Sequence, residues 1–416
     1  MDKNQTLQFE LLKKQIQRVF HKSKFYRDKF SRTMVTPDDI KSIEDIHKLP
    51  FTTREELQNN FDHILSVSSD EIKMFIQTSG TTSGSPLTLA HTKNDINMIA
   101  ESKKRELSLY GVTRQDVAQV TLPYGLWQGA WSTHWGLEEI GSCIIAIGPG
   151  DTERQLNLMR KFGTTVLFAT PNYHLRIAEI LKKTQVNKND LSLRVGVSVA
   201  GKLSNQQIDM LKQEMGYESV YIDYGATEFP GFCTQCPANA ESHHIWSDNY
   251  FVEIVDPETH QPLPEGTRGE LVITSLRKEA TPLIRYLSRD ISTLYHSNVE
   301  CECGLTHPKI DADICREDFM VKIRGATLFP GQIERLVEEI FGVTSNVQIV
   351  VDRRQPSEIL TLNIEANNCL SEATTEDIKG KILRYTKTFT GISVNKINFV
   401  PVGTFGNKYQ KSVVIK

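Results

Sequence analysis

The sequence lacks long apolar runs, a strong net charge and a cysteine framework. No stretch approaches the roughly 18 consecutive apolar residues of a membrane-spanning helix, and the opening MDKNQTLQFELLKKQ lacks a signal-peptide core. Basic residues (48) nearly balance acidic ones (51), so the net charge of −3 disfavours nucleic acid or an anionic membrane as partners. Seven cysteines in 416 residues do not make a disulfide scaffold. These absences predict a cytoplasmic protein with neither kind of partner.

The residues that are present predict an α/β fold. Hydrophobic residues make up 39 % of the chain, enough for a sizeable core, and the length predicts two or three domains. Apolar runs alternate with amphipathic stretches, which is typical of parallel sheets. The predicted strands are Val117–Thr121, Cys143–Ile147, Thr165–Ala169, Arg194–Ala200 and Ser219–Asp223. The predicted helices between them are Thr152–Lys161, Asn172–Lys183 and Asn205–Glu214.

Three further regions depart from this alternation. An N-terminal apolar stripe predicts a helix docked on the core, with a membrane-surface helix as the alternative: Leu7, Leu11, Leu12, Ile16, Val19 and Phe20. Two strands bracket a turn-rich connection and predict an antiparallel, barrel-like section: Phe251–Val255 and Gly269–Thr274. Beyond Arg316 a compact α+β unit is predicted, with helices Gly331–Phe341 and Glu376–Thr388 and strands Val347–Asp352, Ile359–Ala366 and Ile397–Pro401.

The most informative stretch is a loop rich in glycine, serine and threonine, QTSGTTSGSP at residues 77–86. Small side chains allow close approach of the backbone, and consecutive N–H groups with hydroxyls can surround phosphate oxygens. The lysine of a Walker loop is absent. By composition alone, a flexible linker remains the alternative.

Several motifs occur in an order shared with one known superfamily. Besides the loop, they are FHKSKFYRDKF, LPFTTREELQNNF, DYGATE, RGELVITSL, PLIRYLSRD and CREDFMVKIRGATLFPGQIE. On these motifs the chain resembles the adenylate-forming superfamily of acyl-CoA synthetases and peptide-synthetase adenylation domains, and most of all the phenylacetate–CoA ligases. Ser85 stands where the family often has a lysine. The resemblance implies a large N-terminal adenylation domain, residues 1–317, and a small mobile C-terminal domain, residues 318–416.

The resemblance also implies a nucleotide site. Ser79, Gly80, Thr81, Thr82 and Gly84 would hold the phosphates of ATP, and Glu228 would coordinate Mg²⁺, which prefers oxygen ligands. Asp290 would bind the ribose hydroxyls and Tyr224 would contact adenine. The remaining implied contacts are Gly201, Asp223, Gly225, Ala226, Thr227 and Arg316. The alternatives are that Glu228 is an exposed acid after a turn, and that Asp290 pairs with Arg285 or Arg289.

A lysine near the C-terminus is implied to act in catalysis. The segment GNKYQK resembles a family motif in which Lys408 approaches the carboxylate and the α-phosphate. An ammonium on a flexible stem can follow shifting charge. Lys411 is the competing candidate.

Four of the seven cysteines form two short clusters that enclose a histidine pair. Thiolates and imidazoles favour tetrahedral zinc. Some phenylacetate–CoA ligases carry a similar pattern, which selects Cys236, His244, Cys301 and Cys303 in place of Cys233. Four protein ligands would make a closed, structural Zn²⁺ site. Buried free thiols are the alternative.

Residues 124–136, YGLWQGAWSTHWG, resemble the family's acyl-pocket segment. Aromatic side chains beside glycine and alanine suit a flat ring, so an aryl or heteroaryl acid is predicted to contact Tyr124, Trp127, Trp131 and His134. A plain core helix is the alternative.

Together these features predict an acid–CoA ligase that forms acyl-AMP and pyrophosphate from ATP and then transfers the acyl group to CoA. The first alternative acceptor is a separate acyl-carrier protein or an amine. The second alternative is an inactive, zinc-stabilised nucleotide-binding protein. A homodimer is left open.

Overall fold

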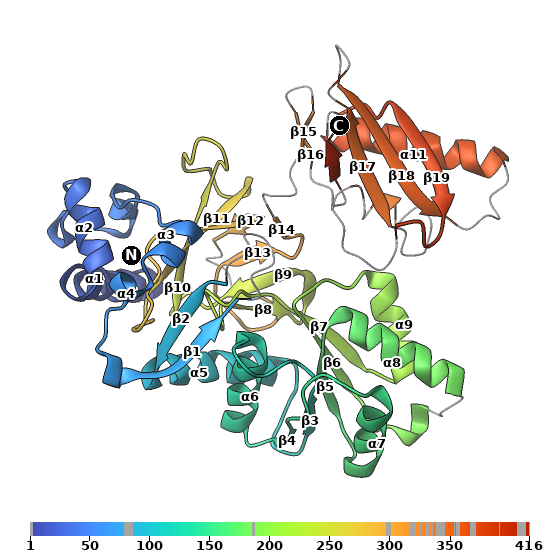
Figure 1. Cartoon of the computed structure of the whole chain (residues 1–416), viewed down its shortest axis with the longest axis horizontal. Helices are drawn as coiled ribbons and strands as arrows, with labels where there is room; N and C mark the ends of the chain where they lie inside the picture. Colours follow the sequence, from blue (N-terminus) through green and yellow to red (C-terminus); the bar gives the residue numbers. More distant parts are fainter. Residues whose placement is uncertain are drawn as a thin grey trace. The chain divides into compact units, whose positions relative to one another are not determined.

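The computed structural model divides into two compact units (Figure 1). The first comprises Met1–Leu203, Met210–Ser288 and Ser292–Ala312, and the second comprises Ser204–Asp209, Arg289–Ile291 and Asp313–Lys416. The structure describes residues 3–78, 86–184, 188–296, 301–316, 321–323, 326–328, 333, 336–337, 346–352, 354, 358–366, 372–390, 392–405 and 413–415. The domain boundary at 317/318 stays a prediction, because residues 317–320 lie outside these ranges.

A five-stranded parallel sheet confirms the predicted α/β alternation. Its strand order is β4-β3-β5-β6-β7. The strands are β3 (Val117–Val120), β4 (Cys143–Ile145), β5 (Val166–Ala169), β6 (Val195–Val199) and β7 (Ser219–Asp223). The helices between them are α6 (Gln128–Ile140), α7 (Thr152–Phe162), α8 (Pro171–Thr184) and α9 (Asn205–Met215).

The ends of these elements have local causes. Strand β4 ends two residues before the predicted Ile147, because the Ile147 N–H donates to Ile145 O (3.0 Å) and the chain turns there. Helix α7 begins after Asp151, whose carboxylate accepts from the Glu153 N–H, and ends at Gly163, whose φ of 63° is left-handed. Because the five strands are parallel, their carboxyl ends meet at one edge of the sheet.

A hairpin and a group of helices precede this sheet in the chain. The hairpin pairs β1 (Ile72–Gln77) antiparallel with β2 (Thr88–Thr92), and the Gly/Ser/Thr loop connects these two strands. The helices are α1 (Lys3–Lys22), α2 (Lys24–Arg32), α3 (Arg54–Asn59), α4 (Phe61–Ile64) and α5 (Lys93–Leu109). Docking of the N-terminal helix is confirmed, because Leu12, Ile16 and Val19 are buried and Gln15 Nε2 donates to Lys278 O (2.6 Å).

The predicted antiparallel section is confirmed. One sheet has the order β10-β11-β12-β13-β9-β8, and β14 also pairs with β12. Its strands are β8 (Cys233–Cys236), β9 (Asn239–Ile245), β10 (Tyr250–Val255), β11 (Arg268–Ser275), β12 (Tyr286–Tyr295), β13 (Lys309–Asp311) and β14 (Cys315–Arg316).

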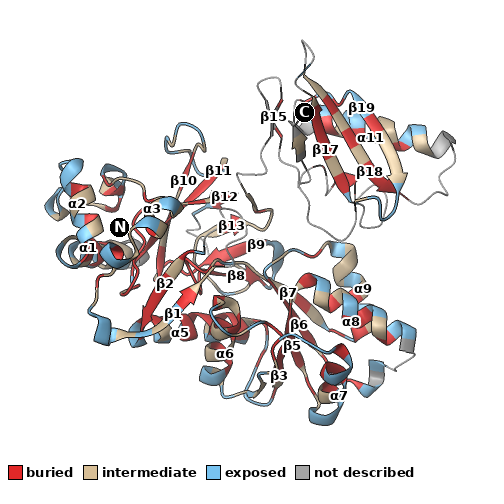
Figure 2. Cartoon of the chain, viewed as in Figure 1, coloured by how far each residue is buried: buried red, intermediate tan, exposed pale blue. Residues whose placement is uncertain are grey.

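The second unit has a sheet and core of its own (Figure 2). The sheet order is β19-β18-β17-β20, and the small hairpin β15-β16 precedes it in the chain. The elements are β15 (Val321–Ile323), β16 (Ala326–Leu328), β17 (Val347–Asp352), β18 (Ile359–Ala366), α11 (Glu372–Thr390), β19 (Lys396–Pro401) and β20 (Val413–Ile415). Most of the predicted helix at 331–341 lies outside the described residues. Among the helices that the structure describes, none is long and apolar enough to span a membrane.

Candidate active site

Glu228 lies between β7 and β8 in a polar network. Its side chain is only 6 % exposed, so the alternative of an exposed acid is wrong. Arg54 Nη1 and the Tyr286 hydroxyl both donate to its Oε1, the latter at 3.1 Å. Both donors bond to the same carboxylate oxygen. The carboxylate is therefore held by one oxygen, and an arrangement of this kind suits a hard cation at the other.

Arg54 connects Glu228 with the start of the Gly/Ser/Thr loop. It is the first residue of α3, and Thr53 and Glu56 form a capping box that fixes this helix end. Its Nη2 donates to Thr78 Oγ1 (2.7 Å), which also accepts from the Leu87 N–H (2.9 Å). Sequence reasoning assigned no role to Arg54, although LPFTTREEL was among the matching motifs.

A buried lysine lies behind Glu228. Lys278 is 0 % exposed, and its Nζ donates to the backbone oxygen of Glu228 (3.0 Å). Burial lowers the pKa of Lys278 to about 8, while Asp95 and Glu228 act in the opposite direction. Asp95 accepts from the N–H groups of Glu279 (2.6 Å) and Ala280 (3.0 Å), which fixes the segment that carries Lys278.

The predicted adenine segment follows β7 at the carboxyl edge of the parallel sheet. Tyr224 is half-buried and lies edge-on to Phe232 and His243, at ring-centroid distances of 6.0 and 6.1 Å. Gly225 is exposed, Ala226 is intermediate and Thr227 is buried.

Asp223 and Gly201, two other predicted nucleotide contacts, each lie against a neighbouring helix. The Asp223 carboxylate accepts from Lys103 Nζ (2.6 Å), so it points towards α5. Gly201, two residues after β6, lies so close to Pro171 that an added Cβ would be 2.8 Å from its Cγ. A side chain at position 201 would therefore force Pro171, the first residue of α8, or its own segment to shift.

Asp290 and Arg316 face each other across the β12–β14 pair. Arg316 Nη1 donates to Asp290 Oδ1 (3.2 Å), and the two residues are also register partners. Arg285, an alternative partner in the sequence analysis, instead forms two bonds with Glu253 (3.0 and 2.8 Å). Arg285 also stacks on Phe51, at 3.9 Å from the ring centroid. This arginine thus ties the segment before α3 to β10.

The predicted acyl-pocket residues form a half-buried aromatic group at the start of α6. Trp131 lies edge-on to Tyr124 (5.1 Å) and His134 (6.1 Å), and Tyr124 Oη lies 3.2 Å from His134 Nδ1. Burial raises the pKa of Tyr124 to about 12, so its hydroxyl stays protonated at neutral pH. Trp127 lies over Gly129, where an added Cβ would be 2.4 Å from the indole.

Backbone bonds connect this aromatic group to the start of the Gly/Ser/Thr loop. The Gln77 N–H, at the end of β1, donates to Leu126 O (2.8 Å), and the Thr78 N–H donates to Leu87 O (3.0 Å). Hydrogen bonds of Thr78 and Arg54 thus connect the start of the loop with Glu228. The bond from Gln77 to Leu126 connects the same strand end with the aromatic group. Ser79, Gly80, Thr81, Thr82, Gly84 and Lys408 lie outside the described residues.

The predicted zinc ligands come together from β8, β9 and the connection before β13. The ligand atoms of Cys236, His244, Cys301 and Cys303 all lie within 4.8 Å of one another. Cys236 Sγ is 3.6 Å from Cys301 Sγ, and Cys303 Sγ is 3.2 Å from His244 Nε2. Tetrahedral zinc with bonds near 2.3 Å would separate two sulfurs by about 3.8 Å. The spacing and chemistry of these donors therefore fit Zn²⁺.

Residues around this cluster orient its donors. His244 Nδ1 lies 3.1 Å from His307 O, which favours a proton on Nδ1 and directs the Nε2 lone pair towards Cys303. Lys309 Nζ donates to Cys301 Sγ (3.2 Å). Cys233, on the same strand as Cys236, donates to Tyr224 O (3.3 Å) instead.

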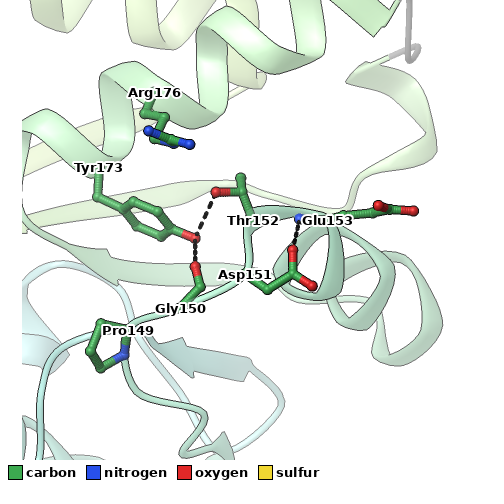
Figure 3. A pocket seen from close by; sticks show the side chains of 7 residues that line it. All are labelled: Pro149, Gly150, Asp151, Thr152, Glu153, Tyr173 and Arg176. Carbon is green, nitrogen blue, oxygen red and sulfur yellow. Dashed lines mark hydrogen bonds between the residues drawn. The ribbon is translucent and has the colours of Figure 1, made fainter.

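A separate cavity of about 470 Å³ lies beside the start of α7 (Figure 3). It is lined by residues 149–153 together with Tyr173 and Arg176 of α8. The Tyr173 hydroxyl donates to Gly150 O (3.3 Å) and Thr152 Oγ1 (3.5 Å). None of the residues predicted for the nucleotide or the acid lines this cavity.

Comparisons with known proteins define the class to which this fold and site belong. A family model described as AMP-binding enzyme matches residues 5–276, and a model described as AMP-binding enzyme C-terminal domain matches residues 325–416. A solved structure of 2-hydroxyisobutyryl-CoA ligase with 2-HIB-AMP superposes with a TM-score of 0.82 at 22 % identity. The superposition covers 99 % of this chain and 89 % of that one, and it shows the shared fold.

Curated relatives are similar over nearly the whole chain. The phenylacetate-coenzyme A ligase of Pseudomonas putida is 32 % identical over 394 residues, covering 93 % of this chain and 88 % of the relative. That of Thermus thermophilus is 32 % identical over 420 residues, covering 97 % and 93 %. The chain therefore belongs to the AMP-binding enzyme family, in its branch of AMP-forming acid–CoA ligases.

Proposed function

We propose that the enzyme activates an aryl or heteroaryl carboxylic acid with ATP and transfers the acyl group to the thiol of CoA. The carboxylate attacks the α-phosphorus of ATP, giving acyl-AMP and pyrophosphate. The thiol sulfur then attacks the acyl carbon, AMP leaves, and the thiol proton passes to solvent. The observation that carries the proposal is the aromatic group of α6, bonded through Leu126 to the strand that enters the phosphate loop.

The aromatic group supports recognition of a flat acid. Tyr124, Trp131 and His134 contact one another edge to face, an arrangement that presents ring faces and edges to a planar ligand. Gln128, the first residue of α6, accepts from buried His91 Nε2 (2.7 Å), which fixes the start of this helix. Trp127 fills the space over Gly129 and would limit the length of the acid.

The nucleotide roles follow from the matched motifs and the polar network. Glu228 would hold Mg²⁺, and the ion would offset charge on the phosphates. Arg54 would bring a positive charge to the loop entrance at Thr78. This charge would matter more in a sequence that has Ser85 in place of a lysine common in the family. Asp290 would bind the ribose, and Arg316 would hold its carboxylate in place.

Two roles rest on the resemblance alone. Lys408 would contact the substrate carboxylate and the α-phosphate during adenylation. The small domain would turn about residues 316–318 before thioester formation. A separate carrier-protein thiol or an amine remains the alternative acceptor, and a homodimer remains open.

Release of pyrophosphate with ATP and Mg²⁺ tests this function across a panel of aryl, heteroaryl and aliphatic acids, with and without CoA. We expect acid-dependent release, with kcat/KM at least about tenfold higher for the best aryl acid than for any aliphatic acid of similar size. With CoA, the aryl thioester should accumulate. Adenylation without thioester would overturn the CoA assignment, and preference for aliphatic acids would overturn the aryl assignment.

We further propose that Cys236, His244, Cys301 and Cys303 bind one structural Zn²⁺. Three sulfurs and one imidazole nitrogen complete a tetrahedron and leave no open position for substrate. The ligands come from chain positions 236–244 and 301–303, so the ion would join β8 and β9 to the connection that leads into β13.

Metal analysis of the purified enzyme should give about one zinc per chain. Cys301→Ser should lose the metal and lower the Tm by about 5–10 °C, because zinc binding contributes to folding free energy. Cys143→Ser is the matched control, since Cys143 is an exposed cysteine on β4, and it should keep both metal and Tm. A metal-free enzyme whose Tm is unchanged by Cys301→Ser would contradict the zinc assignment.

A further inference from the structure

A buried ion cluster joins α5 to the end of β7. Lys103 Nζ donates to Glu106 Oε2 (2.8 Å) and to Asp223 Oδ2 (2.6 Å). The three side chains are 6, 1 and 10 % exposed. Burying a lysine and two carboxyl groups away from water is costly, and well-packed apolar residues often stabilise a fold as well or better. A contribution to overall stability is therefore a weak explanation for this cluster. The location of the cluster in the fold is a better guide to its role.

The cluster lies directly behind the predicted adenine segment. Asp223 is the last residue of β7 and the immediate neighbour of Tyr224. The Tyr224 backbone oxygen accepts from Cys233 on β8, and the Tyr224 ring contacts His243 on β9. On the side that faces α5, the Asp223 side chain fixes this segment through its bond to Lys103.

The same lysine lies where α5 and α6 cross. An added Cβ at Gly136 of α6 would be 2.5 Å from Lys103 Cβ and 3.1 Å from its backbone carbon, so the helices touch at this point. Helix α6 also carries Trp131 and His134 of the aromatic group. Lys103 therefore lies between the helix proposed to bind the acid and the strand end proposed to bind the nucleotide.

The protonation states around the cluster follow from burial. The pKa of Glu106 is raised to about 8, first by burial and then by the charge of Asp223. The two carboxylates raise the pKa of Lys103 although burial opposes them. While Glu106 is protonated, one cation faces one anion and the cluster is neutral.

Three further titratable groups face the cluster. They are Tyr110 directly after α5, Cys233 on β8 and His243 on β9. Burial, together with nearby carboxylates, raises the pKa values of Tyr110 and Cys233, so both stay protonated at neutral pH. Above pH 8 ionised Glu106 would place one uncompensated negative charge behind the nucleotide segment.

We propose that Lys103 is a positioning residue of the adenylation site, whose ammonium holds Asp223 and thereby keeps residues 223–228 in the conformation that receives ATP. This inference rests on the proposed function, because it assigns the nucleotide to that segment. Lys103 would act through Asp223 and would not contact the substrate.

Kinetics of Lys103→Met and Lys103→Arg test the inference. Lys103→Met should raise the KM for ATP at least about tenfold and leave the KM for the acid within about twofold, because only the nucleotide segment loses its anchor. Lys103→Arg keeps the cation and should recover part of the loss. An unchanged KM for ATP in folded Lys103→Met would overturn the inference.

A matched control separates positioning from general stability. Arg194 Nη2 and Asp116 Oδ2 form a pair at 2.6 Å near the amino edge of the same parallel sheet. Arg194→Met should lower the Tm without raising the KM for ATP. An equal rise in that KM for Arg194→Met would refute a specific role of Lys103. If Lys103→Met does not fold, the double variant Lys103→Met/Glu106→Gln takes its place. It removes the cation together with one carboxylate, and it should show the same increase in the KM for ATP.

The pH dependence of Glu106→Gln gives a second readout. Because the folded-state pKa of Glu106 exceeds its ordinary value of 4.5, folded wild-type enzyme binds more protons between pH 4.5 and 8 and loses stability as pH rises through that window. Glu106→Gln should not lose stability as the pH rises through this window. It should also keep its ATP affinity above pH 8, where ionised Glu106 would weaken ATP binding by the wild type. Identical pH profiles for both proteins would contradict the protonation of Glu106.

Direct ATP binding separates the inference from the proposed function. Calorimetry on wild type and Lys103→Met needs no turnover, and it should show at least about tenfold weaker binding by the variant. A wild type that binds ATP but releases no pyrophosphate with any acid would contradict the function and leave the binding comparison valid. Equal ATP affinities would contradict the inference alone.

Discussion

Glu228→Gln is expected to lower the rate of acid-dependent pyrophosphate release at least about 100-fold, equivalent to about 2.7 kcal/mol of transition-state stabilisation. The amide oxygen of glutamine can still accept from Arg54 and Tyr286, so the hydrogen-bonded frame persists. The charge that would attract Mg²⁺ is lost. The variant should therefore also need a higher Mg²⁺ concentration for half-maximal rate, measured by titration at saturating ATP and acid.

The control for this substitution is Glu279→Gln. Glu279 is also a partly buried carboxylate with an arginine partner, since Arg18 Nη2 lies 3.0 Å from its Oε1. It lies one residue after Lys278 and has no proposed contact with the nucleotide. Glu279→Gln should change the rate by less than about threefold. A Glu228→Gln enzyme with normal rate and normal Mg²⁺ dependence would exclude Glu228 as the metal ligand.

Lys408→Ala should reduce acyl-AMP formation about 100- to 1,000-fold, because it removes the cation proposed to offset charge between the attacking carboxylate and the α-phosphate. Transfer from preformed acyl-AMP to CoA should be nearly unaffected, because Lys408 is proposed to contact the carboxylate and the α-phosphate only during adenylation. The two half-reactions are measured separately, by pyrophosphate release and by thioester formation from synthetic acyl-AMP.

Lys411→Ala is the matched control for Lys408→Ala, because Lys411 is the competing lysine three residues away. It should leave both half-reactions intact. If Lys411→Ala instead causes the selective loss, the two assignments must be exchanged. Equal loss of both half-reactions in Lys408→Ala would contradict a role confined to adenylation.

Local patterns in the sequence predict much of the fold. Strands Ser219–Asp223, Val347–Asp352 and Ile359–Ala366 have the same bounds in the structure as in the sequence analysis. In each, an apolar run is bounded by residues that favour turns or helices. Strand β4 is shorter than predicted, because a backbone bond between residues 145 and 147 interrupts an apolar run that continues in the sequence.

The contacts within the candidate site could not be predicted from the sequence, because they join residues that are far apart in the chain. The motifs located Glu228, but they did not reveal that Arg54, 174 positions away, bonds to it. Nor did they reveal that the carboxylate of Asp223, a predicted nucleotide contact, bonds to Lys103, 120 positions away. The Cys/His cluster was the exception, because four soft ligands in short motifs are recognisable before their distances are known.

The docking of the N-terminal helices has a consequence for how the chain folds during synthesis. Gln8, Gln15 and Tyr26 bond to Ser247, Lys278 and Pro282, which follow them by 239, 263 and 256 positions. The first two helices leave the ribosome long before these partners are synthesised. Their apolar stripe therefore stays unburied while the rest of the chain is made. Such long-range closure slows folding and exposes apolar surface to aggregation. Helices α1 and α2 are thus among the last parts of the first unit to reach their native positions.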